Sequence, residues 1–415
     1  RTGTVDWCTT AKTSPFTSVN GKGYFVNTTS GAVTVTLPAS PSAGDIVAFS
    51  DYANTWQTNN VTVCRNSSLI NGGANNASLN TTGSAVTLVY VDGTRGWKQI
   101  NDATENVTGA PTFIVACGGT VTTSGDFKIH TFTSDGTFTI CSAPTPANNN
   151  VSYMVVAGGG GGASSFNANS GGAGGAGGFR EGIEPSVPYT GSPLKSCSGL
   201  PVSVQSYPIS VGAGGAGGPG STPTYLGANG ANSIFSTITS AGGGAGGSGA
   251  SPSNPTAFGA DGGSGGGGGG GSNGPNQPGG AGNTPPVSPP QGQNGGQARP
   301  SPGPANDQAS GGGGGAGGAG GNSPAGSIGG AGGAHVNSSA PGSDTEFSGG
   351  AGGTGYNGAQ GTPGGGGAGV SKQNSPAIAA TAGTANTGGG GGGSYCGCNG
   401  GAGGSGIVVI RYKFQ

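Results

Sequence analysis

The stretch from Ala241 to Gly406 is dominated by glycine and contains only nine larger aliphatic or aromatic side chains. Burying such a side chain stabilises a fold by about 2 kcal/mol, and nine of them fall far short of the entropy lost when so long a backbone is ordered. A conventional apolar core is therefore excluded. The segment is either disordered or ordered by backbone hydrogen bonds, and we expect the second. The nine residues are Phe258, Val287, Ile328, Val336, Phe347, Tyr356, Val370, Ile378 and Tyr395.

Uninterrupted glycine runs such as Gly265–Gly271 and Gly388–Gly393 indicate how that backbone is arranged. About a third of the residues after Gly158 are glycine, which is the fraction found in collagen, but no strict Gly-X-Y register is present. Polyglycine II helices are extended rods with about three residues per turn. Without Cβ atoms, neighbouring rods come close enough to exchange N–H···O=C bonds. The sequence therefore predicts a bundle of packed polyglycine II helices.

Charge is scarce in this chain. Charged residues make up 7% of it and the formal net charge is −1, so no basic surface for nucleic acid is expected. The longest apolar run, Ile407–Ile410, is far too short for a membrane-spanning helix. We expect neither nucleic-acid binding nor membrane insertion.

The seven cysteines are scattered and odd in number, which argues against a complete disulfide framework. Cys396 and Cys398 lie one residue closer together than the cysteines of a Cys-x-x-Cys metal knuckle. Small buried thiols or a few late disulfides are therefore expected in place of a metal site.

Residues 1–104 have the pattern of an ordinary β domain, a small antiparallel sandwich or barrel. No apolar stripe with a period of 3.6 residues survives the glycine and asparagine density, so essentially no α-helix is expected anywhere. Turn-forming residues separate six alternating or β-branched runs. These runs are Gly23–Asn27, Ala32–Leu37, Asp45–Asp51, Asn60–Arg65, Ala85–Asp92 and Gly96–Asn101.

In the rest of the chain, strands lead directly into glycine runs. We divide it into a linker and small β region at 105–157, a rod domain with exposed loops at 158–406, and a C-terminal strand at 407–415 that returns to the β base. Strands at 151–157, 207–211, 233–240 and 407–414 are expected to form one sheet, from which the rods leave and to which they return. The polar interludes between rods are expected to form exposed turns. These interludes are Ser251–Ala260, Ser272–Pro278, Asn283–Ser310, His335–Ser348 and Ser371–Thr387.

Two parts of the chain resemble known families. The motifs of residues 7–102 resemble the small β modules of marine cyanophage tail fibres and virion structural proteins; they include Trp7, Gly23–Thr28, Ala43–Val47, Leu88–Asp92 and Gly96-Trp97. The frame from Phe132 through Tyr153–Gly158 to Gly404–Tyr412 looks like the glycine-rich domain of phage tail proteins. More loosely, it is similar to the polyglycine-sandwich adhesins at the fibre tips of T-even-like phages.

This resemblance implies a non-enzymatic tail-fibre protein of the virion, in which glycine motifs build the scaffold and the loops between them bind a host cell-surface molecule. It also implies a homotrimer in contact with other virion proteins. Two alternatives remain open: a purely structural or capsid-decorating virion protein, and a silk-like glycine-rich matrix protein.

No catalytic constellation, cofactor site or metal site is expected. The two histidines, His130 and His335, are interpreted as a surface or half-buried strand residue and a solvated loop residue. Phe258, Phe347, Tyr356 and Tyr395 have no large apolar neighbours in sequence, so exposure at rod ends or between subunits is expected. Whether they touch a receptor or seal the edge of the rod bundle is left open. The candidate receptor contacts are Phe258, Arg299, His335, Phe347, Tyr356 and Lys372.

Overall fold

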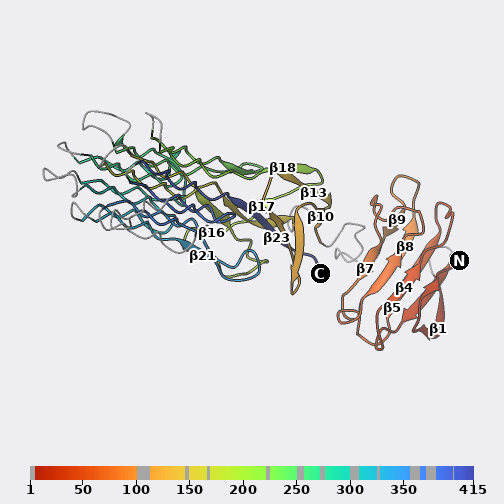
Figure 1. Ribbon diagram of the computed structural model, residues 1–415. Coiled ribbons are helices and arrows are strands. Elements are labelled where there is room, and N and C mark those ends of the chain that lie inside the picture. Colours follow the sequence, from red (N-terminus) through yellow and green to blue (C-terminus); the bar gives the residue numbers. More distant parts are fainter. Residues whose placement is uncertain are drawn as a thin grey trace. The chain divides into compact units, whose positions relative to one another are not determined.

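The computed structural model divides into two compact units, residues 1–112 and 113–415, which are described separately below (Figure 1). Within the part that the structure describes, the regular elements are β-strands and no α-helix occurs, which confirms the all-β fold class. The described residues are 5–100, 113–144, 149–165, 169–220, 225–249, 257–271, 276–299, 308–324, 328–355, 365–370, 380–395 and 397–415.

The first unit contains two sheets that enclose one apolar core. The five-stranded sheet has the order β1-β3-β5-β8-β9, and the four-stranded sheet has the order β2-β4-β6-β7. Trp56 and Trp97 are fully buried between them. The strands are β1 (Asp6–Lys12), β2 (Phe16–Thr17), β3 (Lys22–Val26), β4 (Val33–Thr36), β5 (Ile46–Asp51), β6 (Val61–Cys64), β7 (Ala77–Leu79), β8 (Ala85–Tyr90) and β9 (Trp97–Gln99).

All six expected strands of this unit are present, but the expectation of antiparallel pairing is wrong for much of it. The pairs β1/β3, β3/β5, β2/β4 and β4/β6 are parallel, whereas β5/β8, β6/β7 and β8/β9 are antiparallel. From β1 to β6, successive strands alternate between the two sheets. The chain therefore returns to the same sheet with every second strand, and each new strand there runs parallel to the one before it.

The second unit begins with a base of two further sheets. One is five-stranded with the order β10-β13-β18-β19-β20; the other is seven-stranded, with the order β11-β12-β23-β14-β15-β16 and β17 paired with β14. The hairpin β21-β22 forms a separate two-stranded sheet. The strands are β10 (Val115–Cys117), β11 (Thr120–Ser124), β12 (Phe127–Phe132), β13 (Gly136–Ser142), β14 (Asn150–Val156), β15 (Phe179–Gly182), β16 (Lys195–Ser196), β17 (Leu200–Pro201), β18 (Ser206–Ser210), β19 (Ser233–Phe235), β20 (Ile238–Ser240), β21 (Val336–Ser338), β22 (Thr345–Phe347) and β23 (Ile407–Lys413).

The four strands that flank glycine runs do not form the single sheet expected from the sequence. β14 and β23 are neighbours in the seven-stranded sheet, whereas β18, β19 and β20 belong to the five-stranded sheet. Side chains of both sheets, such as Phe138 and Tyr153, share one apolar core. On the other face of the seven-stranded sheet, Met154 and Val156 pack in a further apolar cluster that includes Phe347 of the hairpin. β14 is therefore covered on both faces, which explains its continuous apolar sequence.

Beyond the base, extended rods run away from the sheets and back again (Figure 1). Their hydrogen bonds repeat every three residues, as the returning rod 171–178 demonstrates. Each third residue donates to the same neighbouring rod, which is the repeat expected of a helix with three residues per turn. The donors and acceptors are Gly171, Gly174 and Gly177 to Ser394, Gly391 and Gly388; Gly172, Gly175 and Gly178 to Gly247, Gly244 and Ala241; and Ala173 and Ala176 to Gly311 and Gly314. The polyglycine II geometry itself stays a prediction.

Glycine is required in these rods because the backbones touch. A Cβ added to Gly160 would lie 2.2 Å from the carbonyl oxygen of Gly244, and one added to Gly174 would lie 2.0 Å from that of Gly160. Real Cβ atoms do not approach backbone atoms so closely. Rod-to-rod hydrogen bonds and backbone contact replace an apolar core in this part of the chain.

The long interlude Asn283–Ser310 is not one turn, contrary to expectation. Near its start, the Asn283 side chain accepts hydrogen bonds from the backbone N–H groups of Val287 and Gln291 and so organises a turn. Gln291 meets the base, because its carbonyl accepts from Phe179 N–H of β15 at 2.8 Å. Residues 291–299 then form a rod, in which Gly296 donates to Gly312. Polar residues therefore occur within the rods as well as between them.

His130 is completely buried in β12, which corrects the expectation of a surface or half-buried position. Its Nδ1 lies 2.7 Å from the Gly118 carbonyl, which can only accept, so Nδ1 carries the proton. Nε2 then accepts from the Tyr412 hydroxyl at 3.0 Å, and the two rings stack. The rings of Tyr412 in β23 and Phe138 in β13 cover this position, and sequence alternation alone does not reveal them.

Burial lowers the pKa of His130 from its ordinary value of 6.5, the nearby Lys128 charge adds to that effect, and the Gly118 bond opposes it. The unfolded chain therefore binds a proton first as pH falls. Above about pH 6.5, His130 should not change the stability of the second unit. As pH decreases from there toward the lowered pKa of His130 in the folded chain, the stability should fall. Calorimetry between pH 8 and 5 should show this loss, and His130→Gln should flatten it; an unchanged slope would contradict the assignment.

Candidate functional site

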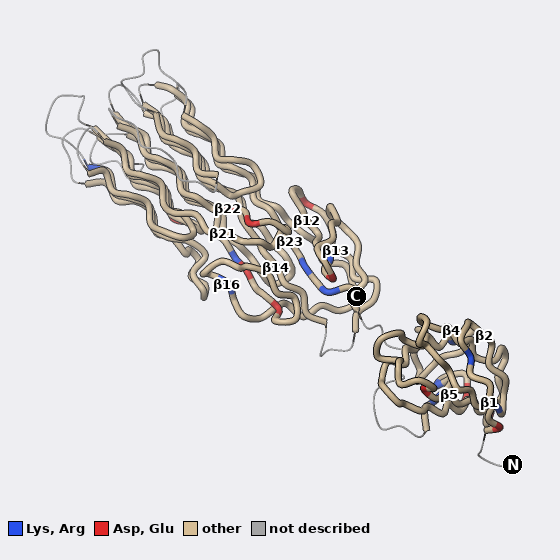
Figure 2. The backbone as a smooth tube through the Cα atoms, turned by 90° about the horizontal axis from the view of Figure 1, so that it is seen from below, with Lys and Arg blue, Asp and Glu red and all other residues tan. Residues whose placement is uncertain are grey.

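Two of the expected receptor contacts, Phe258 and Arg299, lie toward the end of the bundle remote from the sheets. β-Bridges join the far ends of several rods, including those at Ser165, Gly249 and Gly270. Arg299 lies at the same end, because it forms a β-bridge with Ala309. Its side chain is exposed and donates a hydrogen bond to the Pro324 carbonyl at 3.1 Å. Asp261 and Arg299 are the charged residues of the described rods, which are otherwise uncharged (Figure 2).

Two other candidates lie at the opposite end, on the hairpin β21-β22 beside the base. His335 immediately precedes β21, and its Nε2 lies 3.6 Å from Oε1 of Glu346. Phe347 is only 2% exposed and its ring packs against Phe179 with 6.3 Å between centroids. The expectation that Phe347 is exposed was wrong, because the base sheet supplies apolar neighbours that are distant in sequence.

The other residues that were expected to be exposed or to contact a receptor differ in their exposure. Tyr395 is 3% exposed, contrary to expectation, whereas Phe258 is 48% exposed as expected. Tyr356 and Lys372 lie outside the described residues. Phe258 and Arg299 are therefore the candidates that the structure places on an accessible surface away from the base.

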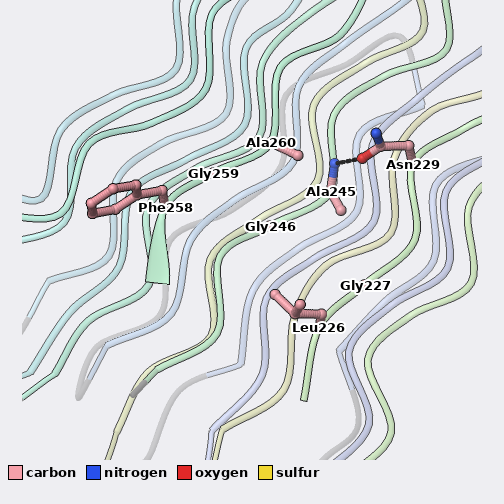
Figure 3. Close-up of a pocket in the computed structure, with 8 residues that line it drawn as sticks. All are labelled: Leu226, Gly227, Asn229, Ala245, Gly246, Phe258, Gly259 and Ala260. Carbon is pink, nitrogen blue, oxygen red and sulfur yellow. Dashed lines mark hydrogen bonds between the residues drawn. The ribbon is translucent and has the colours of Figure 1, made fainter. Parts of the chain in front are cut away.

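Phe258 forms one side of an open groove of about 580 Å³ (Figure 3). Leu226 and Asn229 lie on the other side, and the rod at Ala245 and Gly246 forms the floor. The floor is flat because its residues carry at most a methyl group. The groove thus offers an exposed aromatic ring, an aliphatic side chain and an amide beside a surface of backbone, which are groups suited to contact with weakly polar ligands.

Asn229 also holds the floor in place. Its Oδ1 accepts a hydrogen bond from Ala245 N–H at 2.8 Å, as Figure 3 shows. Three residues later, Asn232 accepts from Gly242 N–H at 2.9 Å, so the spacing matches the three-residue repeat of the rods. Side-chain oxygens here take the place of a neighbouring rod's carbonyl. Asp261, Asn294, Asn322 and Asn399 do the same for Ala281, Gly282, Gln297 and Gly220.

Polar residues between the glycine runs were expected only to form exposed turns. An asparagine or aspartate inside a glycine run, and especially a pair spaced by three residues, was the available signal. Such a residue indicates a place where the N–H group of one rod has no carbonyl of a neighbouring rod as its acceptor.

A buried polar cluster at the base has a structural explanation. Glu181 of β15 is 2% exposed and accepts from the Ser192 backbone N–H at 2.7 Å and from the Ser338 hydroxyl at 2.6 Å. Burial, followed by the charge of Glu181 and its hydrogen bond, raises the pKa of Tyr189 well above its ordinary value. Arg411 stacks on the rings of Phe127 and Tyr189. The cluster fastens the hairpin β21-β22 to the base sheet.

Metal-binding groups are not assembled in the described part of the chain, where no three His, Cys, Asp or Glu residues gather suitably. Cys398 is free there, and Cys396 lies outside the described residues. The same described part has no helix with the length and hydrophobicity needed to cross a bilayer.

Comparison with known proteins bears on the second unit. No curated protein matches the chain. The family described as Glycine-rich domain matches residues 132–413, which begin at the end of β12 and finish at the end of β23. The match thus includes the strands that anchor the rods as well as the glycine runs themselves. This chain belongs to the glycine-rich domain family.

Proposed function

We propose that the protein is a non-enzymatic fibre component of a bacteriophage virion, and that it adheres to a host-surface molecule through the far end of its rod bundle. The single observation that supports this most is the separation of the two ends. One end is a pair of packed sheets, whereas the other presents Phe258 and Arg299 on rods whose described part carries one further charge, that of Asp261.

Such a scaffold suits adhesion for a physical reason. Rods bonded to several neighbours hold their ends in fixed positions, so residues beside those ends lose little further entropy on binding. The groove of Phe258, Leu226 and Asn229 offers apolar contact area and one amide group for orientation. A single weak site of this kind becomes effective when several copies act together on one particle.

This proposal refines the set of receptor contacts. Phe258 and Arg299 remain, and Asn229 and Leu226 join them as residues of the groove. Phe347 is assigned to attachment of the hairpin instead, and His335 to its contact with Glu346 in the same hairpin. Assembly as a homotrimer with other virion proteins belongs to the same proposal, because tail fibres act in multiple copies.

The test compares adsorption of particles that carry Phe258→Ala, Arg299→Ala or both with that of unchanged particles on the same host cells. We expect each change to weaken the contact of one chain about tenfold, which corresponds to about 1.4 kcal/mol. Val204→Ala is the matched control, because Val204 is 62% exposed but lies at the base between β17 and β18.

Unchanged adsorption of the double variant would defeat the adhesion proposal. Imaging of the whole particle separates the alternatives: an adhesin is expected at a tail-side tip, while a decorating protein would cover the capsid or a fibre shaft. A silk-like matrix protein would be absent from particles.

A further inference from the structure

Two thiols lie side by side at the start of the second unit. Cys117 ends β10, and its partner in the antiparallel β13 is Thr139, two residues before Cys141. Both cysteines are free and exposed. The Cys117 and Cys141 side chains therefore meet as diagonal neighbours across adjacent strands, although 23 residues separate them in the sequence.

The strand geometry explains this meeting. Phe138 and Ile140 of β13 are buried in the core, so the alternating residues Thr139 and Cys141 lie on the opposite, exposed face. The pairing also shifts register next to Cys141, between the partners of Val115 and Ala116. A disulfide requires Cα atoms within about 7 Å and converging Cβ directions. Adjacent strands bring the first condition within reach. Cys117 pairs with Thr139 and therefore lies on the same exposed face as Cys141, which favours the second.

We propose that Cys117 and Cys141 form an intrachain disulfide when the protein meets an oxidising disulfide such as oxidised glutathione. One cysteine thiolate attacks a sulfur of the oxidant, forming a mixed disulfide and releasing one reduced glutathione. The second thiolate attacks the protein sulfur of that mixed disulfide and displaces the other reduced glutathione. Two protein thiols are oxidised, the oxidant's disulfide is reduced, and the two protons end on the released thiols.

The bond secures the strand through which the second unit connects to the rest of the chain. β10 has only three residues and lies at the edge of its sheet, directly after the segment 101–112 that leads from the first unit. Tension along the chain acts on this edge strand first. β13 is held on both sides, by β10 and β18, so a covalent link passes the load to a better supported strand. The disulfide acts as a clamp against peeling of β10.

Partial desolvation and the hydrogen bond to Cys117 raise the pKa of the Cys141 thiol. Because the thiolate is the reacting form, oxidation should accelerate as pH rises toward that pKa.

The test treats the purified full chain with oxidised glutathione, blocks remaining thiols by alkylation and digests with trypsin. Cleavage after Lys128 places Cys117 and Cys141 on separate peptides, so their disulfide appears as a linked pair that reduction separates. Cys117→Ser and Cys141→Ser should each abolish the linked pair, whereas Cys8→Ser, in the first unit, should leave it. Alkylation of both thiols after oxidation, or preferential linkage to another cysteine, would overturn the proposal.

Single-molecule stretching tests the clamp itself. In the oxidised chain, the 23 residues between the two cysteines cannot extend, so full unfolding should release about 80 Å less contour length than in the reduced chain. Cys117→Ser should give the longer value in both conditions. Equal contour lengths for the oxidised and reduced chains would count against the link.

Discussion

Gly160→Ala should lower the free energy of unfolding of the second unit by about 3 kcal/mol, the upper part of the usual range for overpacking. Gly160 is buried; it donates to Gly175 and accepts from Gly391. Its added Cβ would lie 2.2 Å from the Gly244 carbonyl oxygen. No flexible side chain can move aside, so two backbones must separate, and their neighbours hold them in place through further hydrogen bonds.

Calorimetry of the full chain measures this effect. All three tryptophans lie in the first unit, so tryptophan fluorescence follows that unit separately and should show an unchanged transition. Gly318→Ala, in the bend between two rods, is the control, because in this partly exposed position its Cβ would come no closer than 3.1 Å to the Ala334 Cβ and 3.3 Å to the Ala334 nitrogen. Equal effects of the two substitutions would refute backbone contact as the source of stability.

Glu181→Ala is expected to destabilise the second unit by about 3 kcal/mol, because it removes a buried carboxylate and leaves its donors without an acceptor. Two of these donors are the Ser192 N–H and the Ser338 hydroxyl. Ser338 belongs to the hairpin β21-β22, so the substitution should also loosen that hairpin from the base.

Hydrogen exchange provides the local measurement for this second substitution. Peptides that cover 336–347 should exchange faster in Glu181→Ala than in the unchanged chain. Glu184→Ala is the control, since Glu184 lies close by in sequence but is partly exposed. If Glu184→Ala loosens the hairpin as much as Glu181→Ala does, the buried carboxylate is not what fastens it.

Strand positions were predictable because they depend on local alternation. β14 and β23 each differ by about one residue from the bounds expected at 151–157 and 407–414. Pairing partners were not predictable in the same way. β18 and β14 precede glycine runs in similar fashion, yet they belong to different sheets. Sheet membership depends on contacts between residues far apart in the chain.

The candidate site shows the same division. Exposure of Phe258 followed from the absence of apolar residues around it in sequence. The same argument failed for Phe347, because Phe179 and Val156 reach it from distant segments. The groove beside Phe258 was also invisible in the sequence, since three separate rods supply its residues.

The amino-acid sequence alone indicates that this chain is all-β and that its glycine-rich part cannot depend on an apolar core, because side chains that are absent cannot be buried. The sequence does not reveal which rods are neighbours, which asparagines replace missing acceptors, or that Asn283 and the hairpin β21-β22 lie beside the base. The physical reason is that rod-to-rod hydrogen bonds use backbone groups that are identical at every glycine, so partner choice depends on the anchoring strands and the lengths of the segments between them.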